Sequence, residues 1–438
     1  MDIKISCPKL VTTSSVKITG SKSETNRLLL LQALYPGISI QNISESDDSI
    51  AMQGALASTG NVVDIHHAGT AMRFLTAYFA QSEGRSVLLT GSQRMQERPI
   101  GVLVDALRSL GADIEYAGNE GYPPLKINGK KLAGGKASIK ADVSSQYITA
   151  LLLIAGKLEN GLELTLEGEL TSIPYIKMTL GLLDEVGIEN TFDGNIITVK
   201  PTTNNQQPST IVVESDWSSA SYFYSIVALS EVGTSITLSA YKENSLQGDS
   251  ALADIYKDFG VSTTYNDNSI VLTREGQQLT TINQELNNTP DIAQTIAVTC
   301  FALGIGCHLT GLHTLKIKET DRLEALKAEL GKFGAEVTVT NDSLSLTPDP
   351  PPKERGESFT QNPTDREDSS EAGTPPLEGL GEAVEVATYN DHRMAMAFAP
   401  LALKVPFVVK DAGVVSKSFP TFWEDMEKLG FEVKAFSH

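Results

Sequence analysis

The chain has 438 residues, more than one hydrophobic core ordinarily serves, so its length predicts two domains. A net charge of −19 argues against nucleic acid or an anionic membrane as the main partner. A small anionic substrate remains compatible with it, because a cleft can gather a few lysines and arginines within an acidic surface.

The cysteines and the first residues bear on the compartment. Cys7, Cys300 and Cys307 show neither metal-ligand spacing nor a disulfide framework, and the last two lie in an apolar stretch where buried reduced thiols are expected. The beginning of the chain lacks the basic and apolar regions of a signal peptide, and no apolar run is long enough to span a membrane. We therefore expect a cytoplasmic protein without a membrane partner.

One pattern recurs along the chain: an amphipathic helix ends at a glycine, and a strand, a turn and a second strand follow. The glycines that end these helices are Gly60, Gly111, Gly187, Gly260, Gly334 and Gly430. Glycine just past a helix end takes the left-handed conformation at little cost, and turns such as FDGN at 192–195 predict hairpins. Six such copies predict an α/β fold built from one repeated unit.

Residues 348–382 interrupt this pattern between the fifth and sixth copies. They are rich in Pro, Glu, Ser and Gly and poor in large apolar residues. Such a composition cannot bury enough surface to offset its ordering entropy. We expect a flexible surface insertion rather than a domain linker, since the pattern resumes after it.

In the first half, four motifs place polar residues at expected helix starts. GSKSETNR at 20–27 joins free backbone N–H groups to two cations, which suits an anion, although a solvated lysine and a helix cap explain it equally. HAGTAMRF at 67–74 is a similar turn into a helix. VSSQY at 143–147 and SIPY at 172–175 supply hydroxyls that are either caps or ligands.

Arginines and carboxylates occur in loops and at further helix starts. GSQRMQERPIG at 91–101 carries two arginines, of which one is a candidate for a carboxylate or phosphate. Asp216 and Asp291 each precede a helix, where capping is the simple interpretation. KETDR at 318–322 reads alone as a solvated helix face, YNDHRMAM at 389–396 opens an apolar helix, and SKSFP at 416–420 places a lysine beside aromatic residues.

Taken together and in this order, the motifs closely resemble those of the 3-phosphoshikimate 1-carboxyvinyltransferases, or EPSP synthases. The resemblance covers nearly the whole chain except 348–382. It implies an inside-out α/β fold of two domains, each with three βαβαββ units. The expected domains are residues 21–213, and residues 1–20 plus 214–438 with the insertion.

The resemblance also implies two substrate sites. For shikimate 3-phosphate it implies Lys22, Ser23, Arg27, Ser144, Ser145, Gln146, Ser172, Asp291 and Lys318. For phosphoenolpyruvate it implies Lys22, Gly69, Thr70, Arg98, Gln146, Arg322, Arg393 and Lys417. The residues implied in catalysis are Asp291, Glu319, Lys22 and Lys318.

The chemistry of the implied reaction accounts for these residue types. Phosphoenolpyruvate carries a carboxylate and a phosphate, so several arginines and lysines must converge on it. The 5-hydroxyl of the acceptor loses a proton while the vinyl carbon gains one, and carboxylates with a lysine can perform both transfers. No metal or organic cofactor is expected, and closure of the two domains would exclude water. We expect a monomer with these two small molecules as its partners.

Three positions depart from the family pattern. His67 stands where Asn is common, Phe74 where Pro is common, and Thr314 where an Asn is common, which bears on affinity and inhibitor response. The alternatives are a UDP-N-acetylglucosamine carboxyvinyltransferase, whose loop corresponding to 91–101 usually carries a Cys that is absent here, and an inactive ligand-binding homologue.

Overall fold

The computed structural model describes residues 1–141, 144–168, 170, 173–202, 209–347 and 384–436. The expected insertion at 348–382 lies outside the described residues, as does Ser172 of the predicted acceptor site. Within these ranges, no helix is long and apolar enough to cross a membrane.

In the described part of the chain, five sheets of four strands share one order, in which the first two strands are parallel and each of the last two is antiparallel to the strand before it. One unit consists of β4 (Val62–Asp64), α3 (Gly69–Gln81), β5 (Ser86–Thr90), α4 (Gln93–Gln96), α5 (Gly101–Ser109), β6 (Asp113–Tyr116) and β7 (Leu125–Asn128). Its sheet reads β4-β5-β7-β6. The chain therefore follows the order strand, helix, strand, helix, strand, strand.

The next unit repeats this order, and a further unit is partial. The complete unit consists of β8 (Gly135–Lys140), α6 (Ser145–Ala155), β9 (Leu162–Glu167), α7 (Ile173–Glu185), β10 (Asn190–Asp193) and β11 (Ile196–Val199). The partial unit consists of β12 (Ser209–Val212), α1 (Lys22–Leu34), β3 (Ile38–Gln41) and α2 (Asp47–Ala57). In the described residues its sheet has two parallel strands, β12 and β3.

The remaining three units use the second half of the chain and its beginning. The first consists of β2 (Thr13–Val16), α8 (Trp217–Ala228), β13 (Ser235–Ser239), η1 (Gly248–Ala251), α9 (Leu252–Ile255), η2 (Tyr256–Phe259), β14 (Val261–Asn266) and β15 (Ser269–Arg274). The second consists of β16 (Ile282–Glu285), η3 (Pro290–Ile292), α10 (Ala293–Ala302), β17 (Cys307–Thr310), η4 (His313–Ile317), α11 (Arg322–Lys332), β18 (Val337–Val339) and β19 (Leu344–Leu346).

The last unit joins the two ends of the chain. It consists of β20 (Glu385–Val386), α12 (His392–Phe398), η6 (Ala399–Leu403), β21 (Phe407–Val409), η7 (Ala412–Lys417), α13 (Phe422–Lys428), β22 (Glu432–Phe436) and β1 (Asp2–Ser6). β1 lies between β21 and β22 and is antiparallel to both, so the first strand of the chain completes the last sheet.

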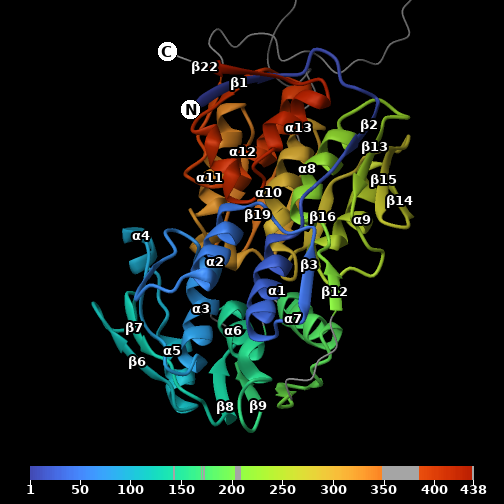
Figure 1. Ribbon diagram of the computed structural model, residues 1–438. Coiled ribbons are helices and arrows are strands. Elements are labelled where there is room, and N and C mark those ends of the chain that lie inside the picture. Colours follow the sequence, from blue (N-terminus) through green and yellow to red (C-terminus); the bar gives the residue numbers. More distant parts are fainter. Residues whose placement is uncertain (142–143, 169, 171–172, 203–208, 348–383, 437–438) are drawn as a thin grey trace, which may run out of the picture.

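Buried apolar side chains form two clusters, which we call the first core and the second core. The first core draws on residues 28–213, and the second on residues 3–18 and 217–431. In Figure 1 the helices of the first core are blue to green and those of the second core are yellow-green to red, and β1 lies beside β22.

Helices fill the middle of each core, and the sheets flank them (Figure 1). α6 is buried at every position from Tyr147 to Ala155, and it packs against α3. A helix that is apolar on all sides has to be surrounded by protein. The predicted α/β fold with a repeated unit is therefore confirmed, with helices inside and sheets outside.

Most of the predicted helix-end glycines have left-handed backbone angles. The φ values are 101° at Gly111, 79° at Gly187, 71° at Gly260, 90° at Gly334 and 97° at Gly430. The prediction for Gly60 is wrong, because α2 ends at Ser58 in an extended conformation and Gly60 has no left-handed φ. The next strand, β4, opens the following sheet, so the chain needs no reversal there.

The chain passes between the two cores at two neighbouring places. Gly20 forms an isolated antiparallel bridge with Ser215, and the backbone N–H of Ser21 donates to the carbonyl oxygen of Glu214 at 2.7 Å. A Cβ on Gly20 would lie 1.9 Å from the carbonyl oxygen of Asn42, so only glycine fits at this crossing.

Two buried carboxylates lie at this crossing. The carboxylate of Glu24 accepts from the backbone N–H of Glu214 at 3.1 Å and from Nε2 of Gln247 at 3.0 Å. The carboxylate of Glu214 accepts from Trp217 Nε1 at 2.8 Å, Lys242 N at 2.9 Å and Ser245 Oγ at 2.6 Å. Burial and the charge of Glu214 raise the pKa of Glu24 to about 7.

Candidate active site

Arg322 is the centre of a group of ion pairs in the second core. It is the first residue of α11, which Asp321 caps. Its guanidinium is buried and donates to Asp391 Oδ2 at 2.6 Å, Asp291 Oδ1 at 2.8 Å and Glu319 Oε2 at 2.9 Å. Burial would lower the pKa of Arg322, but these three carboxylates raise it above its usual value. The interpretation of KETDR as a solvated helix face is therefore wrong for Arg322.

Asp291 lies in η3 and faces cations rather than a helix end. Its Oδ1 lies 3.6 Å from Lys318 Nζ, and its Oδ2 lies 3.4 Å from Arg393 Nη2. Burial would raise the pKa of Asp291, but Arg393, Lys318 and Arg322 hold it well below its usual range. Asp291 caps neither η3 nor α10, so the simple capping interpretation is wrong, whereas Asp216 does cap α8.

Arg393 enters this group from the start of α12, where Asp391 caps the helix by accepting from the Arg393 N–H at 2.9 Å. The guanidinium of Arg393 also donates to the carbonyl oxygen of Asp291 at 3.3 Å and to Ser218 Oγ at 3.2 Å. The Ser218 hydroxyl in turn donates to the carboxyl of Asp249. Burial and the charge of Asp291 raise the pKa of Asp249 to about 7.

Glu319 is the most open carboxylate of the group, with 36% of its side chain exposed. Burial would raise its pKa, but Arg322, His392 and Lys22 hold the pKa of Glu319 well below its usual range. His392 is buried beside it, and neither ring nitrogen has a hydrogen-bond partner among the described residues. Burial and the charge of Lys22 lower the pKa of His392 well below its usual value.

Two lysines lie at the margin of the group. Lys417 Nζ donates to the carbonyl oxygen of Asn390 at 2.6 Å and to its Oδ1 at 2.8 Å, and burial lowers the pKa of Lys417. Lys22, the first residue of α1, lies 3.9 Å from Asp48 Oδ2. The charge of Lys22 also contributes to lowering the pKa of Glu319.

Arg27 is turned into the first core. Its guanidinium donates to Thr179 Oγ1 at 2.9 Å, to the carbonyl oxygen of Ser23 at 2.7 Å and to Thr149 Oγ1 at 3.3 Å. Burial lowers the pKa of Arg27 to about 10. The ring of Phe74, itself buried, lies 5.5 Å from the guanidinium carbon. Neutral protein acceptors thus hold Arg27 in this structure, and its contact with the acceptor stays a prediction.

Tyr175 of α7 was absent from the predicted site, although it belongs to the SIPY motif. Its hydroxyl donates to Asp291 Oδ2 at 3.4 Å. Burial and the charge of Asp291 raise the pKa of Tyr175 well above its usual value, so the hydroxyl keeps its proton. This hydrogen bond joins a helix of the first core to the central carboxylate of the second.

A second group of predicted residues lies where α3 begins. Gln146 Nε2 donates to Thr70 Oγ1 at 3.3 Å and so links α6 to the first turn of α3. Arg98 lies against Gly69, because a Cβ on that glycine would be 2.5 Å from Arg98 Nη1. Among the described residues, the Arg98 side chain has no hydrogen-bond or ion-pair partner. Arg98 is therefore a cation without a partner in the described residues, and it lies beside the first turn of α3.

The remaining predicted acceptor ligands are only partly described. Ser144 caps α6 by accepting from the backbone N–H of Gln146 at 3.3 Å, and Ser145 is the first residue of that helix. Capping, one of the two interpretations of VSSQ, is therefore confirmed for Ser144. Thr314 has a buried hydroxyl without a partner among the described residues.

His67 points toward α2 in this structure. Its Nε2 lies 3.9 Å from Asp47 Oδ2, and the ring is half exposed. The same carboxylate oxygen of Asp47 accepts from the hydroxyl of Ser416 at 2.9 Å. His67 thus belongs to a polar contact between α2 and η7, next to Lys417.

The structure brings nine of the predicted residues together in two groups. Asp291, Lys318, Glu319, Arg322 and Arg393 form one, and Gly69, Thr70, Arg98 and Gln146 form the other. In the described part of the chain, no hydrogen bond or ion pair joins the two groups directly. Tyr175, Asp391 and Asp249 also belong to the first group but were missed, because residues distant in sequence pair only once the chain is folded.

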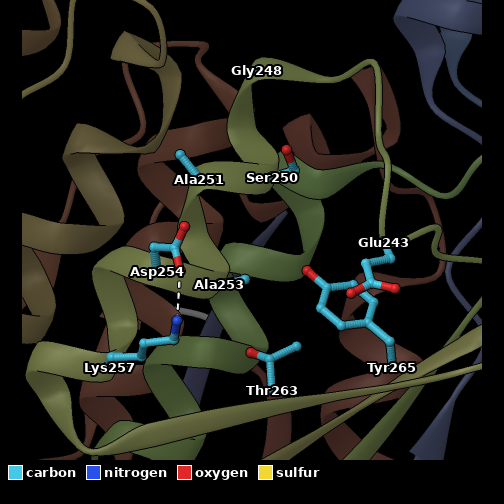
Figure 2. A pocket seen from close by; sticks show the side chains of 9 residues that line it. All are labelled: Glu243, Gly248, Ser250, Ala251, Ala253, Asp254, Lys257, Thr263 and Tyr265. Carbon is cyan, nitrogen blue, oxygen red and sulfur yellow. Dashed lines mark hydrogen bonds and ion pairs between the residues drawn. The ribbon is translucent and has the colours of Figure 1, made fainter.

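A cavity of about 480 Å³ lies elsewhere, beside η1 and α9 (Figure 2). Figure 2 shows Asp254 paired with Lys257 on one side and Tyr265 beside Glu243 on the other. None of the residues predicted for catalysis or substrate binding lines it. Across the described ranges, no three histidine, cysteine or acidic side chains are arranged to hold a metal ion.

Comparisons with known proteins agree with the sequence motifs. The family model described as EPSP synthase (3-phosphoshikimate 1-carboxyvinyltransferase) matches residues 52–426. A Bacteroides fragilis protein named 3-phosphoshikimate 1-carboxyvinyltransferase is 44% identical over 425 residues, covering 96% of each chain. A Haemophilus influenzae protein of the same name is 36% identical over 447 residues, covering 95% of this chain and 96% of its own.

Solved structures agree on the fold. An EPSP synthase from Acinetobacter baumannii superposes with a TM-score of 0.79 at 21% identity, covering 99% of this chain and all of its own. At that identity the likeness concerns the fold, whereas the family model and the relatives concern the sequence. With both in agreement, this chain belongs to the EPSP synthase family, the 3-phosphoshikimate 1-carboxyvinyltransferases.

Proposed function

We propose that the two groups of residues form the site where this chain transfers the carboxyvinyl group of phosphoenolpyruvate to the 5-hydroxyl of shikimate 3-phosphate. The products are 5-enolpyruvylshikimate 3-phosphate and phosphate. This is the reaction of the family, and the names of the relatives do not favour UDP-N-acetylglucosamine as the acceptor. The observation that carries the site assignment is the ionised Asp291 among Arg322, Lys318 and Arg393.

In this assignment Arg98, Arg322, Arg393, Lys22 and Lys417 bind the donor. Arg98 is free, whereas Arg322 and Arg393 already pair with carboxylates. A donor that brings a phosphate and a carboxylate would share these cations with Asp291. The cationic field on Asp291 would then weaken, and its pKa would rise toward a value useful for a base.

The proton transfers follow from the same assignment. Asp291, with Lys318 beside it, takes the proton of the 5-hydroxyl as that oxygen forms a bond to the central carbon of the donor. When the anionic groups of the donor share Arg322 and Lys22, the cationic field on Glu319 weakens as well, and Glu319 with Lys22 then delivers a proton to the methylene carbon, which becomes a methyl group. In the second step the methyl group returns that proton to Glu319, the double bond forms again as the bond to phosphate breaks, and the leaving phosphate takes the proton that Asp291 accepted.

Shikimate 3-phosphate is assigned to the first core and its border. Lys22, Ser23 and Arg27 lie on α1, and Ser144, Ser145 and Gln146 lie at the start of α6. Ser172 is assigned with them on the motif alone. The bond between Tyr175 and Asp291 supports a site that both cores share.

Three further properties belong to this proposal. We propose that residues 21–213 form one domain and residues 1–20 plus 214–438 the other, which agrees with the two apolar cores. We also propose a monomer that works in the cytoplasm, a reducing compartment suited to three free thiols. Light scattering and cell fractionation test these two points.

An assay of phosphate release tests the reaction. The protein is mixed with phosphoenolpyruvate and either shikimate 3-phosphate or UDP-N-acetylglucosamine. We expect release with the first acceptor only. Phosphate release with UDP-N-acetylglucosamine only would mean that this is the acceptor. Release with neither acceptor would mean that the protein is an inactive homologue.

A further inference from the structure

Arg73 is a buried arginine that the predicted site did not include. It lies on α3, is 5% exposed, and donates from Nη1 to the carbonyl oxygen of Gly69 at 3.0 Å and from Nη2 to that of Pro99 at 3.4 Å. A third contact reaches Met95 Sδ at 3.7 Å. Within the described ranges, no carboxylate lies at ion-pair distance from it. A buried cation with only neutral acceptors is costly, so stability does not account for an arginine here.

Arg98 adds a second cation to the same turn. From a Cβ on Gly69, Arg98 Nη1 would lie at 2.5 Å and Arg73 Nη1 at 3.2 Å, so both guanidiniums cover this glycine. Burial and the charge of Arg98 lower the pKa of Arg73 to about 10. Like charges this close repel, and a bound anion would relieve the repulsion.

The turn at 95–99 is held from two sides. Arg73 donates a hydrogen bond to the carbonyl oxygen of Pro99 in this turn, and the hydroxyl of Tyr147 donates to the same oxygen at 2.6 Å. At its other end the guanidinium of Arg73 is fixed to Gly69 in the first turn of α3. The planar fork of arginine spans both carbonyls, which the single ammonium of a lysine cannot do.

We propose that Arg73 is a positioning residue for the donor site, which fastens the 95–99 turn to the start of α3 and so fixes Arg98 beside Gly69. The proposal rests on the assignment of Arg98 to the phosphoenolpyruvate anion. Because Arg98 has no carboxylate partner to leave, it can accept the anion without breaking an ion pair. Arg73 contributes by fixing the position of Arg98.

The test compares Arg73→Met and Arg73→Lys with a matched control, Arg85→Met. Arg85 also holds a turn through carbonyl oxygens, those of Ser58, Thr59 and Gly60, but it lies away from both groups of site residues. We expect Arg73→Met to raise the KM for phosphoenolpyruvate by about 10- to 100-fold with a smaller change in kcat. Arg73→Lys keeps the charge but loses the fork, and we expect a rise of about tenfold. Arg85→Met should leave this KM unchanged.

A second background separates positioning from general damage. In an Arg98→Met protein, adding Arg73→Met should change kcat/KM by less than about twofold, because the group that Arg73 positions is gone. If Arg73→Met lowered kcat/KM equally in the parent and in the Arg98→Met protein, the proposal would be overturned. A normal KM for phosphoenolpyruvate in Arg73→Lys and in any soluble Arg73→Met would overturn it as well. If instead the parent released no phosphate from the two substrates, the reaction assignment would fail. Direct binding of phosphoenolpyruvate to the parent and to Arg73→Lys would then decide the role of Arg73: equal affinities would overturn it.

Discussion

Replacing Glu24 with Gln removes one of the two buried carboxylates where the chain passes between its cores. The folded protein raises the pKa of Glu24 from 4.5 to about 7, because the group is buried and Glu214 lies beside it. The folded state therefore keeps a proton that the unfolded state has already released. This contribution to stability is full below pH 4.5 and is lost as the pH rises toward about 7.

The size of the effect follows from the shift. Each unit of pKa corresponds to about 1.4 kcal/mol, so ionisation of Glu24 costs the folded state about 3 kcal/mol above pH 7. Glutamine resembles the protonated acid and does not titrate. Relative to the parent, the free energy of unfolding of Glu24→Gln should rise by about 3 kcal/mol between pH 4.5 and pH 7.5. At every pH, Glu24→Gln should also lose about 1 kcal/mol of its free energy of unfolding, because glutamine lacks one of the two acceptor oxygens of the carboxylate.

The measurement is urea unfolding at several pH values, followed by the fluorescence of the two tryptophans, of which Trp217 is buried and donates its indole N–H to Glu214. Glu120→Gln, at an exposed position, controls for the change in net charge. Curves of stability against pH that stay parallel for the parent and Glu24→Gln would refute the reasoning. A difference that grows toward low pH would do so as well.

The other predictions concern the two groups of site residues. Arg98→Ala and Arg393→Ala should each lower kcat/KM for phosphoenolpyruvate by about 2–4 kcal/mol of transition-state stabilisation, and near-normal values in steady-state kinetics would contradict the donor site. Asp291→Asn should lower kcat far more than it changes the affinity for shikimate 3-phosphate; calorimetry that found binding abolished would make Asp291 a ligand instead of a base. Gly69→Ala places a methyl group 2.5 Å from Arg98 Nη1, so KM for phosphoenolpyruvate should rise about tenfold while Tm barely changes, and an unaltered KM would show that Arg98 moves aside without loss.

The sequence predicted the repeated unit because local signals determine it. Left-handed glycines such as Gly111 and Gly334 end helices for steric reasons that act within a few residues. The prediction at Gly60 was wrong because a similar sequence also occurs where a helix is followed by an extended residue and the next unit begins.

The candidate site was less accessible to local reasoning. Arg322 and Glu319 are three residues apart, as on any helix surface, yet Arg322 is buried because Asp391 and Asp291 meet it from other elements. The burial of Arg73 and the hydrogen bond of Tyr175 to Asp291 depend likewise on packing between distant segments. Motif order pointed to the reaction, and three-dimensional proximity was needed to see which cations are already neutralised.

The position of β1 between β21 and β22 has a consequence for biosynthesis. This strand leaves the ribosome long before its two neighbours, which begin at Phe407, so most of the chain described here must be made before it can pair. The backbone N–H of Ala412 donates to the carbonyl oxygen of Met1 at 2.8 Å, so the residue before β1 is also bound to this late segment. A chain whose two ends were linked and which was opened at another surface turn would keep every strand neighbour and remove that wait.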